Sequence, residues 1–302
     1  MYSYQLYGFI LSSTLDFPQL LEVSKDNTAG KLNADIYIRE MPEDEHLTTK
    51  EKHARYGVGH QRSWLSNRTG DFLIRNGKEI LYRAVEGANL WYLRSYLLGY
   101  VMAMLLHQRS MFAVHCSAMI QDGEATLITG ESGSGKSTLT AQFLAHGAKL
   151  AADDIAAVKC AGKNSICYPA FPYQKLVRDA ALAQGYDLSR LLYINETKDK
   201  FLVPMHKKFE PFSHPVKQMI YLAPATVKEI QIRRLSGLEQ LYAFQKSQFL
   251  HSLPGEWETE GGFLQLSLQA AATFPIYLVL RPQDGSTEAE ETYRKICAKR
   301  GS

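Results

Sequence analysis

The chain has 302 residues, of which 45% are hydrophobic and 22% are charged, and its formal net charge is +3. These proportions are typical of a globular protein with one large domain or two smaller ones, and they exclude a disordered or low-complexity chain. The net charge is too small to indicate a nucleic-acid or membrane surface, so we expect neither partner. No secretory signal is visible, and the longest apolar run, residues 96–106, is too short to span a bilayer; both observations favour the cytoplasm.

The first 85 residues alternate short strand patterns with polar loops. Asn76-Gly77 predicts a hairpin turn, and the charged segment 40–56 is predicted as a loop. The predicted strands cover residues 4–11, 34–39, 71–75 and 79–83. We therefore expect a small β-rich N-terminal domain over residues 1–86 and a second domain over residues 87–302.

Residues 88–108 are predicted to form one long helix that leads into a strand over residues 112–120. Asp122-Gly123 is a hairpin signal. If Gln121 pairs with Glu124 across that turn, the same register places His115 opposite Gly130. A single histidine on a strand is often structural, but this position beside a glycine-rich loop favours a functional role.

Residues 130–137, GESGSGKS, fit the phosphate-binding pattern G-x-x-x-x-G-K-[ST]. They follow a predicted strand over 125–129 and precede a predicted helix over 136–145, which Gly147 can end. Glycines let successive backbone N–H groups turn toward phosphate oxygens, and a helix N-terminus attracts the same anion. A glycine-rich turn that binds nothing is the alternative, which these flanking elements disfavour. The expected nucleotide-binding residues are Gly130, Glu131, Ser132, Gly133, Ser134, Gly135, Lys136, Ser137 and Thr138.

Residues 149–154 are predicted as a short strand that ends in Asp153 and Asp154. A strand–helix–strand crossover makes this strand parallel to the one over 125–129, so the loop and the acids emerge at the same sheet edge. One carboxylate there can hold a metal ion, and the other can accept a proton. In the glycine-rich pattern Lys136 supplies a cation for the β- and γ-phosphates, and Ser137 supplies a hydroxyl ligand for Mg²⁺.

The remainder of the chain continues the alternation of strands and helices. A helix is predicted over 174–184, ended by Gly185, and on it Lys175 and Arg178 would share a face. The other predicted strands cover 155–158, 165–168, 200–203, 216–222, 229–235 and 276–280, and the other predicted helices cover 238–253, 263–273 and 287–299.

Four cysteines occur, at positions 116, 160, 167 and 297, without metal-type spacing. Cys160 and Cys167 flank a predicted hairpin turn and could face each other across it. Free thiols in a reducing cytosol are the expectation that we favour.

Three parts of the sequence together carry a family resemblance. The stretch His115-Cys116-Ser117-Ala118, the glycine-rich loop 130–137 and the pair Asp153-Asp154 resemble the catalytic core of the HPr kinase/phosphorylase superfamily. The same order of histidine strand, phosphate loop and paired acids is similar to that of phosphoenolpyruvate carboxykinase. The sequence has no counterpart of the C-terminal signature segment of the HPr enzymes, so the resemblance does not extend to phosphorolysis or to HPr as substrate.

Three further segments resemble a narrower group within this superfamily; they cover residues 106–109, 172–179 and 198–204. The members of this group are the HPr-kinase-like proteins found with lasso-peptide biosynthesis, which phosphorylate the terminal serine of the precursor peptide. The resemblance implies an α/β (α+β) fold, with a P-loop kinase core of the HPr kinase/carboxykinase type after the β-rich domain. It also implies an ATP-dependent serine kinase with Mg²⁺ as its cofactor.

The superfamily resemblance suggests a role for each site residue. Asp153 would be the catalytic base, oriented or polarised by His115, and Asp154 would bind the metal with Ser137. Lys175 and Arg178 are tentative substrate residues, placed to pair with a peptide carboxylate. The expected partners are a nucleotide and a peptide with a terminal serine, and assembly into a homo-oligomer remains open.

Two other functions remain open. A nucleotide-binding regulatory ATPase would use the same loop to move the β-rich domain, and its slow hydrolysis would not respond to a precursor peptide. A small-molecule kinase, or a carboxykinase, would act on a metabolite instead of a peptide.

Overall fold

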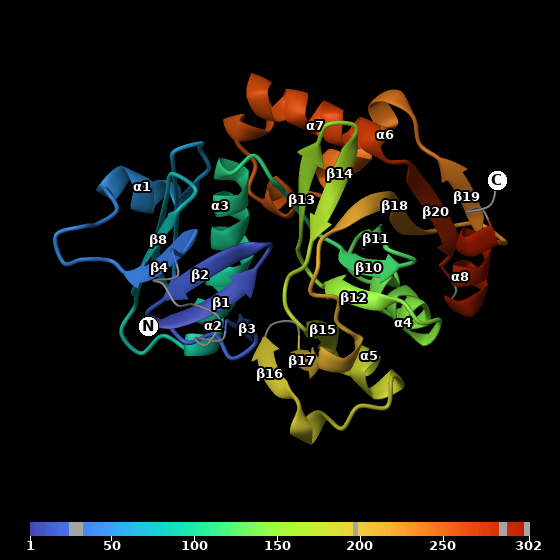
Figure 1. The fold of residues 1–302 in the computed structure, drawn as a ribbon, viewed down its shortest axis with the longest axis horizontal. Helices are drawn as coiled ribbons and strands as arrows, with labels where there is room; N and C mark the ends of the chain where they lie inside the picture. The colour runs from blue at the N-terminus through green and yellow to red at the C-terminus, as the bar shows by residue number, and fades with distance from the viewer. Residues whose placement is uncertain (24–32, 196–198, 284–288, 299–302) are drawn as a thin grey trace. The chain divides into compact units, whose positions relative to one another are not determined.

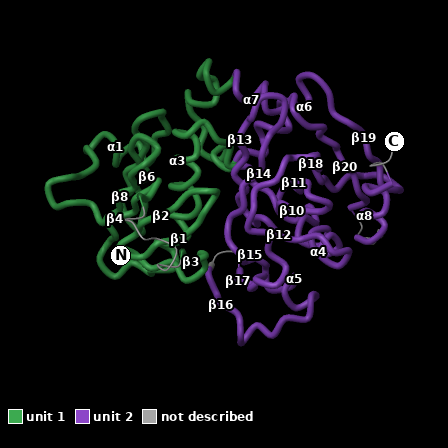
Figure 2. Tube along the Cα trace, in the orientation of Figure 1, with its two compact units in different colours: residues 1–113, 249–264 green, residues 114–248, 265–302 purple. Residues whose placement is uncertain are grey.

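The computed structural model describes residues 1–23, 33–195, 199–283 and 289–298. It is a mixed α/β structure in which these residues divide into two compact units (Figure 2). Unit 1 comprises residues 1–113 and 249–264, and unit 2 comprises residues 114–248 and 265–302. The units therefore separate after Ala113, later than the predicted boundary at residue 86, and the assignment of separate domains to 1–86 and 87–302 stays a prediction.

Unit 1 contains an eight-stranded sheet in the order β3-β1-β2-β4-β8-β7-β6-β5 (Figure 1). Its strands are β1 (Tyr2–Leu6), β2 (Phe9–Ser13), β3 (Leu21–Glu22), β4 (Ile36–Glu40), β5 (Tyr56–Gly57), β6 (Arg62–Asn67), β7 (Gly70–Arg75) and β8 (Glu79–Ala84). The Asn76-Gly77 turn between β7 and β8 is confirmed, and both of its residues have positive φ. The single strand predicted over 4–11 is wrong, because Tyr7 and Gly8 have positive φ and turn the chain into the β1–β2 hairpin.

The segment 40–56 is not all loop, because it contains helix α1 (Thr49–Ala54). The Thr48 hydroxyl accepts a hydrogen bond from the Glu51 N–H at 3.2 Å, and the Glu51 carboxylate accepts one from the Thr48 N–H at 2.8 Å. This capping box satisfies two backbone donors at the start of the helix. The T-x-x-E spacing was therefore the sequence signal for α1.

The long helical run predicted over 88–108 is present with a distortion in its middle. It consists of α2 (Leu90–Tyr96), a π-helical segment (Leu97–Val101) and α3 (Met102–Gln108). Gly99 departs from helical geometry, with φ −96° and ψ −108°, and such a π segment is a known cause of helix kinks. Most side chains between Leu97 and His107 are buried, and α3 packs on β7, so this run forms much of the core of unit 1.

Unit 2 is built on a sheet whose order is β12-β10-β11-β18-β14-β13, with β20 beside β18 and β19 beside β20 (Figure 1). The strands are β10 (Ser117–Gln121), β11 (Glu124–Thr129), β12 (Lys149–Ala152), β13 (Ala156–Ala161), β14 (Asn164–Tyr168), β18 (His214–Ala225), β19 (Gln231–Arg234) and β20 (Ile276–Pro282). The strand predicted over 112–120 is interrupted, because β9 (Phe112–Val114) ends before His115 and β10 begins at Ser117. β18 runs parallel to both β11 and β20, so all three end at one edge of the sheet.

The main helices of this part of the chain largely follow the predictions. They are α4 (Lys136–Ala145), α6 (Gly237–Lys246), α7 (Gly261–Thr273) and α8 (Ala289–Ala298). The helix predicted over 238–253 ends early, at Lys246, and a 3₁₀ turn (Phe249–Ser252) follows. Both ends of the helix predicted over 287–299 lie outside the described residues. Leu139 and Phe143 of α4 are buried in the core of unit 2.

The helix predicted over 174–184 is wrong in its first half. Residues 173–177 form strand β15 (Tyr173–Val177), which pairs with β17 (Lys200–Pro204) in a small sheet completed by β16 (Leu192–Asn195). Gln174 and Leu176 are fully buried whereas their neighbours are more exposed, which is the two-residue period of a strand. Helix α5 (Arg178–Ala183) begins only after β15, and Gly185 follows it with φ +79°.

Candidate functional site

The glycine-rich loop and the two acids leave the same edge of the unit 2 sheet. β10 pairs antiparallel with β11 on one side and with β12 on the other, so β11 and β12 are parallel, as predicted. The loop begins directly after Thr129, the last residue of β11, and Asp153 and Asp154 follow Ala152 at the end of β12. Connectivity and sheet order thus bring the two motifs together.

The loop backbone takes conformations that require glycine. Gly130 has φ +144° and Gly135 has φ +96°. A Cβ atom on Gly130 would lie 2.2 Å from the backbone oxygen of Leu222, and one on Gly135 would lie 3.1 Å from Arg281 Nε. The backbone conformation therefore disfavours side chains at both positions, and at Gly130 the Leu222 backbone also leaves no space for one. Helix α4 begins immediately afterwards, so its first N–H groups, which lack helical partners, adjoin the loop and can attract an anion.

Lys136 turns back onto the loop that precedes it. Its Nζ donates to the backbone oxygens of Gly130 and Glu131, at 2.6 and 2.9 Å. Burial lowers the pKa of the Lys136 ammonium, while the negative charge of Asp153 opposes that change. The Lys136 ammonium therefore contacts the loop carbonyls and also interacts electrostatically with Asp153 and Asp154.

Asp153 is a buried carboxylate held by two donors. Its Oδ1 accepts from the Ser117 hydroxyl at 2.6 Å, and its Oδ2 accepts from the backbone N–H of Lys175 at 2.8 Å. Burial raises the pKa of Asp153, although both hydrogen bonds act in the opposite direction. A carboxylate with a raised pKa can act as a proton acceptor closer to neutral pH than an ordinary aspartate.

Asp154 has the opposite electrostatic character. Its Oδ2 lies 2.6 Å from Lys175 Nζ, and its Oδ1 lies 3.6 Å from His115 Nδ1. Burial alone would raise the pKa of Asp154, but the charge of Lys175, followed by those of His115 and Lys200, lowers it well below the ordinary value of 3.8. Its φ of +77° is unusual for a residue other than glycine, and such strain often occurs at functional sites. The carboxyl group of Asp154 is therefore ionised at neutral pH.

His115 lies between the loop and the acid pair, but not through the predicted strand pairing. The β10–β11 register is confirmed from Gln121–Glu124 to Ser117–Ile128. Because β10 begins at Ser117, His115 is not paired opposite Gly130. Instead, its backbone oxygen accepts from the Thr129 hydroxyl at 3.0 Å, and its Nδ1 lies 2.9 Å from the backbone oxygen of Asp154. Burial lowers the pKa of His115, while the charge of Asp154 opposes this effect.

The two tentative substrate residues do not share a helix face, so this prediction is wrong. Lys175 lies on β15 and contacts the acid pair through both its backbone and its side chain. Arg178 starts α5 and forms two hydrogen bonds with the exposed carboxylate of Asp199, at 2.5 and 3.0 Å. The structure therefore brings Lys175 to the site, whereas Arg178 is engaged in a surface ion pair.

Three further residues belong to this region, and sequence reasoning assigned them no role. Ser117 holds Asp153. Lys200 lies opposite Val177 in the β15–β17 pairing, so it projects from the same sheet face as Lys175 and contributes to the low pKa of Asp154. Arg281, near the end of β20, donates to the loop through its guanidinium. Its position directly after the strand predicted over 276–280 was the only sequence signal for it.

The described part of the chain contains neither a separate cluster of metal ligands nor a disulfide. No group of three or more His, Cys, Asp or Glu side chains is arranged there to hold a metal ion. All four cysteines are free, as we predicted. Cys160 and Cys167 do not face each other, because Cys160 pairs with Ser165 and Cys167 pairs with Val158 across the β13–β14 hairpin. None of the described helices is both long and apolar enough to cross a membrane.

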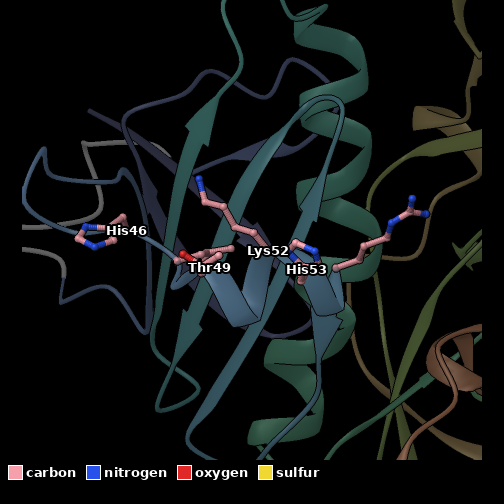
Figure 3. Close-up of a pocket in the computed structure, with 6 residues that line it drawn as sticks. His46, Thr49, Lys52 and His53 are labelled. Atoms are coloured by element: carbon pink, nitrogen blue, oxygen red, sulfur yellow. The ribbon is translucent and has the colours of Figure 1, made fainter.

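Unit 1 also contains an open pocket, around α1. It is lined by His46, Leu47, Thr49, Lys52, His53 and Arg55. Figure 3 shows that its labelled side chains spread in different directions instead of converging on one point. Lys52 also lies 2.8 Å from the carboxylate of Asp71. This pocket therefore does not assemble a reactive constellation of the kind found beside the glycine-rich loop.

Comparison with known proteins adds little beyond the residues themselves. No family model matches the chain, and no curated protein sequence matches it. Among solved structures, the chain is similar to the Hpr(Ser) kinase/phosphatase from Coxiella burnetii, with 14% sequence identity and a TM-score of 0.35. The match covers 62% of this chain and 90% of that one. A similarity at this level does not establish a function for this chain.

Proposed function

We propose that this chain is an ATP-dependent kinase with a P-loop core, which transfers the γ-phosphoryl group to a seryl hydroxyl. The acceptor that we propose is the C-terminal serine of a lasso precursor peptide. The supporting observation is that one sheet edge holds a glycine-rich loop with Lys136 and, beside it, two aspartates whose pKa values move in opposite directions. Such a site suits phosphoryl transfer, because that reaction depends on positioning and on neutralisation of phosphate charge.

The loop residues fit the phosphate chain of a nucleotide. Residues 130–138 would bind it through backbone N–H groups at the start of α4, where the glycine conformations leave room for close approach. The Lys136 ammonium, which contacts two loop carbonyls, would turn to the β- and γ-phosphates.

Magnesium would be held by Ser137 and Asp154. The low pKa of Asp154 keeps this carboxylate in the charged form that binds Mg²⁺. Mg²⁺ is commonly held by one or two protein groups together with phosphate oxygens and water, so a site with few protein ligands fits it. When bound, the ion supplies neutralisation of the charge on the phosphate oxygens.

Asp153 is the base in this proposal. Its carboxylate takes the proton of the seryl hydroxyl while the seryl oxygen bonds to the γ-phosphorus and the bond from that phosphorus to the bridging oxygen breaks, which leaves ADP and phosphoserine. Each carboxylate oxygen has two lone pairs, so Asp153 can accept a proton while Ser117 and the Lys175 N–H keep it in place. His115 keeps the acid pair oriented through its contact with Asp154.

The small sheet beside the acid pair, where the peptide would bind, carries positive charge on β15 and β17. Lys175 and Lys200 project from one face of the small sheet, beside Asp154. This charge suits a peptide chain that ends in a carboxylate, and it replaces the combination of Lys175 with Arg178 that the sequence suggested.

The test is mass spectrometry of a cognate precursor peptide after incubation with the protein, Mg²⁺ and ATP. We expect one or more phosphoryl groups on the final serine, and none when that serine is changed to alanine or when Lys136→Ala replaces the wild type. Rapid phosphorylation of a metabolite instead of the peptide would favour a small-molecule kinase. ATP hydrolysis that no peptide or metabolite stimulates would favour a regulatory ATPase.

A further inference from the structure

Arg281 is a basic side chain that reaches the glycine-rich loop from a strand two positions away in the sheet. It lies near the end of β20, which is separated from β11 by β18. Its Nε donates to the backbone oxygen of Ser134 at 2.7 Å, and one terminal nitrogen donates to the backbone oxygen of Gly133 at 3.3 Å. The guanidinium thus binds the carbonyls of two consecutive loop residues.

Because the peptide bond is planar, these hydrogen bonds to loop carbonyls also determine where the neighbouring N–H groups point. In a trans peptide unit the C=O and the N–H point in opposite directions. The Ser134 carbonyl belongs to the same unit as the Gly135 N–H, so its hydrogen bond to Arg281 directs that N–H away from the guanidinium. The Gly133 carbonyl shares its unit with the Ser134 N–H, which donates back to the Glu131 oxygen at 3.1 Å and closes the loop turn.

The Arg281 guanidinium also lies close to Gly135. A Cβ at this position would lie 3.1 Å from Arg281 Nε and 3.4 Å from its Cζ. Gly135 is also the residue directly before α4, where N–H groups have no helical partner. Arg281 therefore packs against the part of the loop whose N–H direction it fixes.

We infer that Arg281 is a positioning residue that holds the loop with the Gly135 N–H turned toward the phosphate chain of a bound nucleotide. This inference rests on the proposed function. Arg281 acts through the loop backbone and not through contact with the base, so its contribution is the same for every ligand that carries the polyphosphate group.

The experiment measures dissociation constants of MgATP, MgADP and magnesium tripolyphosphate, which has no base, for the full-length chain by calorimetry. We expect Arg281→Ala to weaken all three by ~10- to 100-fold, the effect of losing hydrogen bonds from a charged group. Arg281→Lys, which keeps the charge but not the forked geometry, should recover only part of this loss. Added guanidinium ion should restore binding to Arg281→Ala but not change the wild type.

Lys246→Ala is the matched control. Lys246 also contacts the loop, but only through the exposed side chain of Glu131, at 2.8 Å, so its loss should change affinity by less than about threefold. Circular dichroism of each variant establishes that it is folded before binding is compared.

Three outcomes would overturn the inference. The first is a folded Arg281→Ala variant with wild-type affinity, and the second is a loss confined to the nucleotides with tripolyphosphate unaffected, because Arg281 would then contact the base or sugar. The third is a wild type and a Lys246→Ala variant that bind none of the ligands, which refutes the proposed function itself and the inference with it.

Discussion

The ammonium of Lys175 lies 2.6 Å from Asp154 Oδ2, while the backbone N–H of the same lysine donates to Asp153 Oδ2 at 2.8 Å. One residue of β15 thus contacts both acids. Its positive charge is the main cause of the low pKa of Asp154, whereas at Asp153 it only opposes burial, which raises the pKa of that carboxyl. Lys175, which the sequence predicted on a helix, therefore lies on a strand and influences the charge of both acids.

The first prediction follows from this contact. In Lys175→Met the backbone hydrogen bond to Asp153 remains but the charge is lost, so the pKa values of both acids should rise. Because the proposed reaction needs both carboxylates ionised, the acid limb of the pH profile of kcat/KM, which follows the acid with the higher pKa, Asp153, should move to higher pH. Arg178→Met is the control: its ion pair with Asp199 is exposed and does not touch the acids, so its profile should match the wild type. Equal profiles for all three proteins would contradict the prediction.

The second prediction separates the two acids. Asp153→Asn can keep both hydrogen bonds, because its carbonyl accepts from the Lys175 N–H and the Ser117 hydroxyl can reverse to accept from the amide. We expect nucleotide affinity within a few-fold of wild type and a transfer rate lower by roughly 10²–10⁴. Asp154→Asn should instead raise the Mg²⁺ concentration needed for half-maximal rate. Stopped-flow transfer rates and Mg²⁺ titrations measure both effects, and swapped phenotypes would reverse the proposed roles.

The third prediction concerns the loop cation. Lys136→Ala removes the ammonium that contacts the Gly130 and Glu131 carbonyls. Phosphoryl transfer at saturating Mg-ATP should be abolished, because no other residue within the loop carries a positive charge. Radioactive phosphate transfer measures this, and unimpaired turnover would refute the nucleotide assignment.

The fourth prediction is a pH dependence of stability that arises in unit 1. His107 is 2% exposed, neither ring nitrogen has a hydrogen-bond partner among the described residues, and it packs against the rings of His60, Trp257 and Phe263. Burial, helped by the charge of His60, lowers the pKa of His107 to about 4 from 6.5. The unfolded chain therefore takes up a proton below pH 6.5 that the folded chain does not, so stability falls between pH 6.5 and about 4.

The size of this effect is about 3 kcal/mol across the window, by linkage. Urea unfolding of wild type and His107→Leu at several pH values measures it, and the variant should lack this component of the decline. His53→Leu is the control, because His53 is exposed on α1 and should leave the pH dependence unchanged. A wild type and a His107→Leu variant with parallel pH dependences would show that His107 does not stay neutral in the folded state.

The fifth prediction concerns the cysteines. All four are free, and Cys116 and Cys167 are buried. Neither a reductant nor a chelator should change the melting temperature of the nucleotide-free protein. A decrease of several degrees, the size expected for a loss of about 1–2 kcal/mol in a protein of this size, would contradict this expectation.

Much of the site could be predicted from the sequence because it depends on short segments and on connectivity. The strand over 125–129, the helix over 136–145 and the hairpin register across Asp122-Gly123 are set by local patterns, and the structure confirms them. A single helix between two strands favours a parallel crossover, and β11 and β12 are parallel as this connection predicts. The meeting of the glycine-rich loop with Asp153 and Asp154 therefore followed from the sequence by itself.

Tertiary structure decided what those motifs contact. The segment 173–177 has a helix-compatible composition, and only its pairing with β17 and the burial of Gln174 and Leu176 make it a strand that brings Lys175 to the acids. Arg281 is 147 residues from the loop carbonyl that it binds, and no local pattern encodes such a contact. Opposite pKa changes in two adjacent aspartates likewise depend on burial and on charges from distant strands, which exist only once the sheet has formed.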